Sequence, residues 1–118
     1  MKKIQNSSVL IILNFMKILL TTYPNDWRKL KNLITALLKK KLIACCNIIN
    51  YWKSYYIWEN KIKKDEEKIV FIKFPKEKEN ELINFIKKNH PYETPELIIL
   101  QPESIDEKYL NRIHESTK

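Results

Sequence analysis

The sequence contains no glycine among its 118 residues, although glycine adopts a positive φ angle more readily than any other residue. Positions that need a positive φ must therefore be occupied by residues with a side chain, of which asparagine tolerates this conformation well. We expect Asn50, Asn60 and Asn89 to take these positions. The stretch TTYPND, residues 21–26, offers neither a glycine-rich loop nor an arginine, which argues against a phosphate-cradling enzyme of the acylphosphatase type.

Cysteine is scarce, since only Cys45 and Cys46 occur, and adjacent thiols rarely satisfy disulfide geometry. They indicate reduced thiols in a cytoplasmic protein. No histidine or further cysteine lies at ligand spacing, so we expect both to pack as small apolar groups rather than to bind a metal.

Long apolar runs are also missing. Residues 9–20 are interrupted by Asn14 and Lys17 and are fewer than the about 20 residues that cross a bilayer, so no membrane association is predicted. We predict that residues 1–15 form a loosely ordered extension, with a signal peptide as the alternative, and that residues 16–118 form one domain.

The formal net charge of +8 would attract anions such as nucleic acid. The lysines, however, are scattered along the chain and form no stripe of arginine and aromatic residues of the kind that single-strand binders use. We therefore do not expect nucleic acid as a partner, although an RNA-binding module with this strand order stays the alternative. Against it, the strand KIVFIKF lacks the glycine and aromatic core on which such modules stack bases.

Hydrophobic periodicity and turn residues predict alternating strands and helices. The predicted order is a strand over 16–23, a helix over 26–41 capped by Asn25, a strand over 42–58 with a bend near Asn50, a turn at 59–61, a strand over 68–74, a helix from Pro75 to 89, a strand over 96–102 and a helix over 106–117. This order predicts an α+β ferredoxin-like split βαβ (βαββαβ) sandwich with a long hairpin and a C-terminal helix. Both helices would lie on one face of the sheet and leave the other face bare.

Aromatic residues occur on both faces of the second predicted strand. With the period of two that strands have, Trp52, Ser54, Tyr56 and Trp58 share one face. A sheet face rich in aromatic rings must be covered by self-association, a ligand or nucleic acid. These four side chains either line a ligand-binding cleft or fill a subunit interface.

The stretch HPYETPE, residues 90–96, places several polar side chains between two prolines, which make the segment rigid. His90 is a candidate metal ligand or, alternatively, a helix C-terminal cap. Tyr92, Glu93 and Glu96 are candidates to line a cleft between subunits, and the alternative is that these carboxylates only fix the loop.

Taken together, LLTTYPND, LIACCNII, the spaced Ser54, Tyr56 and Trp58 followed by ENK, and HPYETPE resemble the CutA family of divalent-cation tolerance proteins over residues 16–114. The resemblance implies a tight homotrimer, joined through the long hairpins, with clefts between subunits that hold a metal ion or a small anionic ligand. It also implies a non-catalytic role in tolerance to copper or another divalent cation. The similarity of such trimers to PII-type signalling proteins implies ligand sensing by analogy of fold.

The resemblance also implies a set of metal ligands. Two of the family's ligand positions are occupied here by Thr21 and Asn89, and a third is occupied by His90, with Glu96 as an oxygen neighbour. One imidazole and one carboxylate make a weak site for Cu²⁺ unless three subunits combine their groups. We therefore expect weak binding of Cu²⁺ or another divalent cation.

Overall fold

The computed structural model describes residues 15–118, so the extension predicted over residues 1–15 lies, apart from Phe15, outside the described residues. In chain order the elements are β1 (Met16–Pro24), α2 (Trp27–Lys39), β2 (Cys45–Trp58), β3 (Lys61–Pro75), the short 3-10 helix η1 (Lys76–Lys78), α3 (Glu79–Asn89), β4 (Ile98–Leu100) and α4 (Glu107–Ser116). The predicted α+β order of strands and helices is confirmed. No helix within residues 15–118 is both long and apolar enough to span a membrane.

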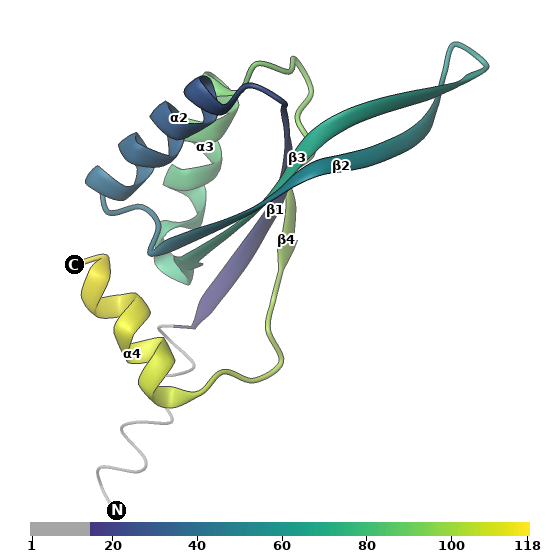
Figure 1. Cartoon of the computed structure of the whole chain (residues 1–118). Helices are drawn as coiled ribbons and strands as arrows, with labels where there is room; N and C mark the ends of the chain where they lie inside the picture. The colour runs from purple at the N-terminus through teal and green to yellow at the C-terminus, as the bar shows by residue number, and fades with distance from the viewer. Residues whose placement is uncertain (1–14) are drawn as a thin grey trace, which may run out of the picture.

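The strands form one antiparallel sheet in the order β2-β3-β1-β4, which is the order of the predicted split βαβ fold (Figure 1). β1 pairs with β3 along its whole length and with β4 only from Ile18 to Leu20. The last strand is therefore shorter than the predicted 96–102. Pro95 and Pro102, which flank it, have no N–H group to donate to a longer ladder.

The main core lies between the sheet and the pair α2 and α3, which pack side by side on the same face (Figure 1). Alternate residues of β1 and β3 point into this core, among them Leu19 and Phe74, which are fully buried. The helices contribute leucine and isoleucine at helical spacing. These buried helix residues are Leu30, Leu33 and Leu37 from α2 and Leu82 and Ile86 from α3.

The face of the sheet opposite α2 and α3 is partly covered by α4. Met16, which alternates with the core residues of β1, is buried against Leu110 and Ile113 of α4. The prediction of a bare second face was therefore wrong at this end of the sheet, because the C-terminal helix folds back onto it. Further along the same face, Ile98 and Leu100 of β4 remain exposed.

The hairpin of β2 and β3 projects from the body of the molecule (Figure 1). Trp58 pairs with Lys61, so its loop contains only Glu59 and Asn60, with φ angles of 51° and 62°. Two successive positive φ angles suit the right-handed twist of a hairpin, as in type I′ turns. The tight turn and the positive φ of Asn60 are confirmed.

The positive φ angles predicted for Asn50 and Asn89 are wrong, and Lys41 and Tyr51 adopt this conformation instead. Lys41, with φ 59°, directly follows the C-cap of α2. Its N–H donates to the Leu38 carbonyl, and the next N–H donates to the Leu37 carbonyl at 3.1 Å. This pair of bonds is a Schellman motif, which needs a left-handed residue wherever the helix stops, whatever the side chain there.

The bend predicted near Asn50 is a β-bulge. β2 has one more residue than β3 between the pairs Ile49–Ile69 and Trp52–Glu67, and Tyr51 within it has φ 57°. The Asn50 side chain still contributes, since its Oδ1 accepts a 2.5 Å hydrogen bond from Nζ of the buried Lys68.

Two predicted helix starts were also wrong. Asp26, not Asn25, caps α2, because its carboxylate accepts a 3.2 Å hydrogen bond from the Lys29 N–H. Pro75 is the last residue of β3, and α3 begins only at Glu79 after η1. In both cases the residue type alone did not identify the first helical residue, because this residue also depends on the path of the backbone after the preceding strand.

Candidate ligand-binding cleft

A cleft of about 560 Å³ lies where the segment after α3 passes beside the hairpin. Residues from three parts of the chain line it: the end of β1, the hairpin and the stretch HPYETPE. They are Thr22, Tyr56, Trp58, Lys63, Asp65, Glu67, Tyr92, Glu93, Thr94 and Glu96. A concave volume of this size, with aromatic walls and several convergent polar groups, is typical of sites for small ligands.

The hairpin supplies one wall of the cleft through the alternation of its side chains. Tyr56 pairs with Lys63, and Asp65 lies two residues further along the same face of β3. The Tyr56 hydroxyl donates a hydrogen bond to the Asp65 carboxylate, and this bond raises the pKa of Tyr56. The phenol therefore stays protonated at neutral pH, and its hydrogen bond joins a side chain of β2 to a side chain of β3.

The opposite wall is joined to the hairpin by Tyr92. Its hydroxyl donates a 2.8 Å hydrogen bond to Oε2 of Glu67, a residue that is only 8% exposed. Burial, reinforced by the Glu67 carboxylate, raises the pKa of Tyr92 far above its usual value. The phenol therefore stays protonated at neutral pH, and its hydrogen bond joins the segment HPYETPE to β3.

His90 lies behind the cleft rather than in its lining. The Thr22 carbonyl can only accept, so Nε2–H donates to it at 2.8 Å, and Nδ1 accepts from the Tyr92 N–H at 3.0 Å. His90 is 8% exposed, and its ring lies 5.0 Å, centroid to centroid, from the ring of Tyr23. Burial lowers the pKa of His90, more than the Thr22 carbonyl and the Glu67 carboxylate raise it.

This geometry gives His90 a neutral ring with both nitrogens engaged. It occupies the C-cap position of α3, as the alternative interpretation predicted, but its ring bonds to β1 and to the following loop instead of to helix carbonyls. Ligation of a metal by His90 stays a prediction, and it requires one of these two hydrogen bonds to break.

The side chains at the other predicted metal positions each make separate contacts. Thr21 is buried, and its hydroxyl donates to the Thr22 carbonyl at 3.3 Å. The Asn89 side chain donates a 2.8 Å hydrogen bond to the Phe85 carbonyl, while Glu96 is exposed in the cleft. Within residues 15–118 no three His, Cys, Asp or Glu side chains are grouped to hold a metal ion.

The structure gathers most, but not all, of the predicted cleft residues. Tyr56, Trp58, Tyr92, Glu93 and Glu96 line this cleft of the single chain, and their predicted place between subunits stays a prediction. Two others share the hairpin face of Tyr56 without lining the cleft. They are Trp52, which pairs with Glu67, and Ser54, which pairs with Asp65.

Lys63, Asp65 and Glu67 were not predicted as cleft residues, because the predicted strand began only at residue 68, whereas β3 begins at Lys61. The two-residue turn at Glu59 and Asn60 is the sequence feature from which these three residues could have been predicted. It fixes the register of the hairpin, which places Asp65 and Glu67 on the same face as Trp52, Tyr56 and Trp58.

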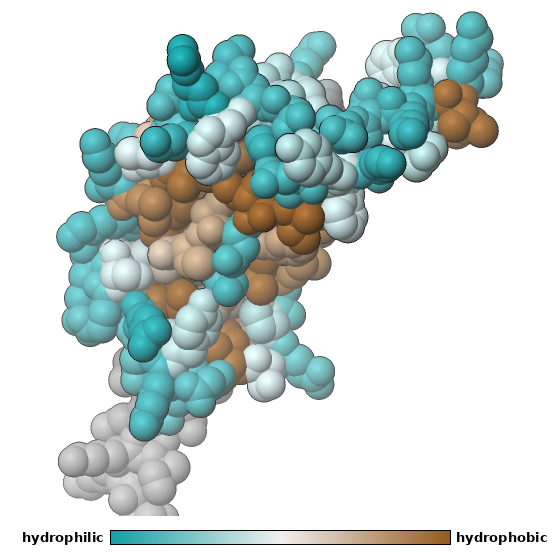
Figure 2. Space-filling model, viewed as in Figure 1, coloured by the Kyte–Doolittle hydropathy of each residue, from teal (hydrophilic) through white to brown (hydrophobic). Residues whose placement is uncertain are grey.

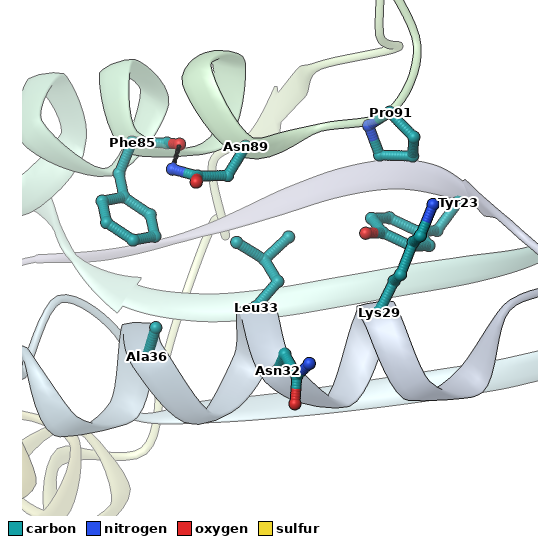
Figure 3. A pocket seen from close by; sticks show the side chains of 8 residues that line it. All are labelled: Tyr23, Lys29, Asn32, Leu33, Ala36, Phe85, Asn89 and Pro91. Atoms are coloured by element: carbon teal, nitrogen blue, oxygen red, sulfur yellow. Dashed lines mark hydrogen bonds between the residues drawn. The ribbon is translucent and has the colours of Figure 1, made fainter.

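A second pocket of about 360 Å³ lies between α2 and α3 (Figure 3). Leu33 and Phe85 form its apolar centre, and Asn89, bonded to the Phe85 carbonyl, closes one side (Figure 3). The remaining lining residues are Tyr23, Lys29, Asn32, Ala36 and Pro91. The pocket carries no carboxylate, so it differs in charge from the cleft.

Cys45 and Cys46 are free thiols on neighbouring positions of β2. Cys46 packs against the main core, and burial, with a smaller effect of Cys45, raises the pKa of Cys46 to about 12. Its thiol is therefore protonated and poorly nucleophilic at neutral pH. The predicted packing role fits this environment.

Residues 17–116 match the protein family described as CutA1 divalent ion tolerance protein. Divalent-cation tolerance protein CutA of Pyrococcus horikoshii is 37% identical over 103 residues, which cover 87% of this chain and 99% of that protein. Its namesake in Thermotoga maritima is 38% identical over 101 residues, which cover 86% of this chain and 98% of that protein. The crystal structure of divalent ion tolerance protein CutA1 from Ehrlichia chaffeensis has a TM-score of 0.84 and 29% identity, covering 90% of this chain and 98% of that one.

The similarity extends from β1 through α4 and includes the hairpin and the segment that form the cleft. Agreement in both sequence and fold over this length confirms the resemblance that HPYETPE and the hairpin motifs indicated. The chain belongs to the CutA1 divalent ion tolerance family.

Proposed function

We propose that this protein acts in divalent-cation tolerance as a non-catalytic, cytoplasmic homotrimer whose cleft binds a cation. One observation carries the cation-binding part. The cleft contains the carboxylates of Asp65, Glu67, Glu93 and Glu96 against the single ammonium group of Lys63, although the whole chain has a net charge of +8. A cleft of this charge favours a cation over the small anionic ligand considered from the sequence.

Self-association is supported by the apolar surface that the described chain leaves open. Ile57 and Ile62 face each other across the hairpin and are 67% and 76% exposed. Tyr51 and Tyr55 of the same hairpin are exposed as well. Figure 2 shows apolar surface in the middle of the molecule and again at the far end of the hairpin. Exposed apolar surface of this kind marks a protein interface.

Light scattering tests this assembly. A trimer has three times the chain mass of 14.3 kDa. A charged group in the hairpin, introduced by Ile57→Glu, is expected to dissociate the trimer, because burying an unpaired charge is unfavourable. The matched control is Leu38→Glu, because Leu38 is also an exposed apolar residue but lies on α2. A wild-type protein that stays monomeric at micromolar concentration contradicts the proposed trimer.

Calorimetric titration with Cu²⁺ tests the metal. We expect weak binding, reduced by Glu96→Gln and unchanged by Glu81→Gln, an exposed carboxylate on α3 outside the cleft. Identical isotherms for wild type and His90→Ala would exclude His90 as a ligand. Binding that Glu96→Gln leaves unchanged would place the metal outside the cleft.

The location in the cytoplasm is proposed from the two free thiols alone. The RNA-binding alternative is not favoured by the structure, because Asp65, Glu66 and Glu67 lie opposite the aromatic strand of the hairpin. Their charges would repel a phosphate backbone at the rings on which bases would have to stack.

A further inference from the structure

The carboxylates of the cleft have no cationic partners in the described chain. The ion pairs within residues 15–118 all lie elsewhere, on η1, α3, α4 and the start of β1. Lys63, the one basic side chain in the lining, forms none of them. The cleft therefore presents a local excess of negative charge on a basic protein.

Glu67 is the strongest indication of a missing cation. The residue is 8% exposed, and the Tyr92 hydroxyl is its one hydrogen-bond donor within the described chain, on Oε2. No basic group of that part of the chain comes within ion-pairing distance of it. Buried carboxylates are normally paired, because removing the charge from water is unfavourable. A cation that enters the cleft would supply the pairing that residues 15–118 of the single chain do not.

The walls of the cleft suit an organic cation. Trp58 and Tyr56 are 59% and 42% exposed, so their rings are available, and Tyr92 adds a third ring from the opposite wall. Aromatic faces attract ammonium groups through their quadrupoles and pack against the methylene chain that carries them. The volume of about 560 Å³ is that of a small organic ligand rather than of one bare metal ion.

The number and separation of the acids indicate a ligand with more than one charge. Glu67 and Asp65 lie on β3, whereas Glu93 and Glu96 come from the opposite wall. Each ammonium group has up to three N–H donors and no acceptor, so it can pair with a carboxylate. A ligand with two ammonium groups could therefore pair with the carboxylates on both walls. No group of three side chains within residues 15–118 is arranged to hold a metal instead.

We propose that the cleft binds a linear organic polyamine, with its ammonium groups on the carboxylates of Glu67 and of the opposite wall and its methylene chain against Trp58 and Tyr56. This inference rests on the proposed cation-binding cleft and names a class of ligand for it. The ammonium group nearest Glu67 would complete a buried ion pair that Tyr92 already supports with one hydrogen bond.

Titration of the full-length chain with spermidine at low ionic strength tests the proposal. Glu67→Gln retains an acceptor for the Tyr92 hydroxyl but removes the charge, so we expect affinity to fall by about tenfold or more. Trp58→Ala is expected to weaken binding as well, and Glu81→Gln on the exposed side of α3 is the matched control. Because the chain as a whole is positively charged, non-specific attraction of a polyamine is small.

The outcomes separate this inference from the proposed function. Absence of spermidine binding, or binding that Glu67→Gln leaves unchanged, overturns it. Binding of Mg²⁺ or Cu²⁺ at Glu67 without spermidine binding also overturns it, while leaving the proposed divalent-cation role intact. Binding of inorganic phosphate in the cleft would contradict both. A monomeric protein that still binds spermidine through Glu67 would refute only the trimer.

Discussion

Replacement of His90 by alanine tests whether this residue holds the cleft segment in place. The change removes two hydrogen bonds, one of 2.8 Å to the Thr22 carbonyl and one of 3.0 Å from the Tyr92 N–H. Each buried polar group left without a partner costs about 1–3 kcal/mol. Because water can enter the space left by the ring, we expect a loss of about 2–4 kcal/mol, which is a large share of a typical domain's stability of about 5–15 kcal/mol.

Urea unfolding followed by circular dichroism measures this loss. With a urea dependence of about 1–3 kcal/mol per molar, the midpoint is expected to fall by about 0.7–4 M. All variants must be compared at one protomer concentration, because self-association adds to apparent stability. Lys87→Ala, at an exposed position of α3, is the control and should change stability by less than about 0.5 kcal/mol.

The same histidine makes stability depend on pH. Burial lowers the pKa of His90 in the folded state, so below the unfolded value of about 6.5 the unfolded chain binds the extra proton more readily. The stability that His90 contributes is complete above about pH 6.5 and is lost as the pH falls from there toward the lower folded value. Protonation also places a proton on Nδ1, where it opposes the Tyr92 N–H.

We therefore expect wild type to be less stable at about pH 5.5 than at about pH 7.5, and expect most of this difference to disappear in His90→Ala. The chain has one other histidine, so His114→Ala serves as the control for its contribution. An unchanged urea midpoint in His90→Ala, or an unaltered pH dependence, would refute the structural role assigned to His90.

Three further predictions concern stability and use the same urea assay. Lys41→Gly should stabilise the protein by about 1 kcal/mol, because glycine adopts the φ of 59° without steric cost, and a loss of stability would contradict this. Asp26→Ala should destabilise it by about 1 kcal/mol through loss of the cap on the Lys29 N–H, whereas Asn25→Ala should have little effect; equal effects would contradict the assignment of the cap. Phe74→Ala should cost about 3–5 kcal/mol, since its ring is fully buried between the sheet and the helices, and a cost below about 1 kcal/mol would place it outside the core.

Local patterns in the sequence predicted the elements well. The helical spacing of leucines in residues 26–41 identified α2, and the β-branched and aromatic stretch around Trp52 identified β2. Asn60 was found because a two-residue hairpin turn demands a residue that tolerates positive φ. The motif HPYETPE led to the family, and the family model and relatives confirm it.

Boundaries were predicted less well, for a physical reason. Whether Asn25 or Asp26 caps α2 depends on which of them directly precedes the first helical residue, and that residue is Trp27. In the same way, Lys41 has a positive φ because α2 ends at that point, and the absence of glycine leaves that conformation to a lysine. The side chains alone carried little information about either position.

The amino-acid sequence by itself determined the order of strands and helices, the family and the presence of a polar segment that contains two prolines, because these depend on local periodicity and residue type. Only the tertiary structure decided that Glu67 and Tyr92 meet across the cleft and that His90 bonds to Thr22. Such contacts join residues far apart in the chain, and they follow from strand register and from the path of the segment after α3. Neither is encoded in a window of neighbouring residues.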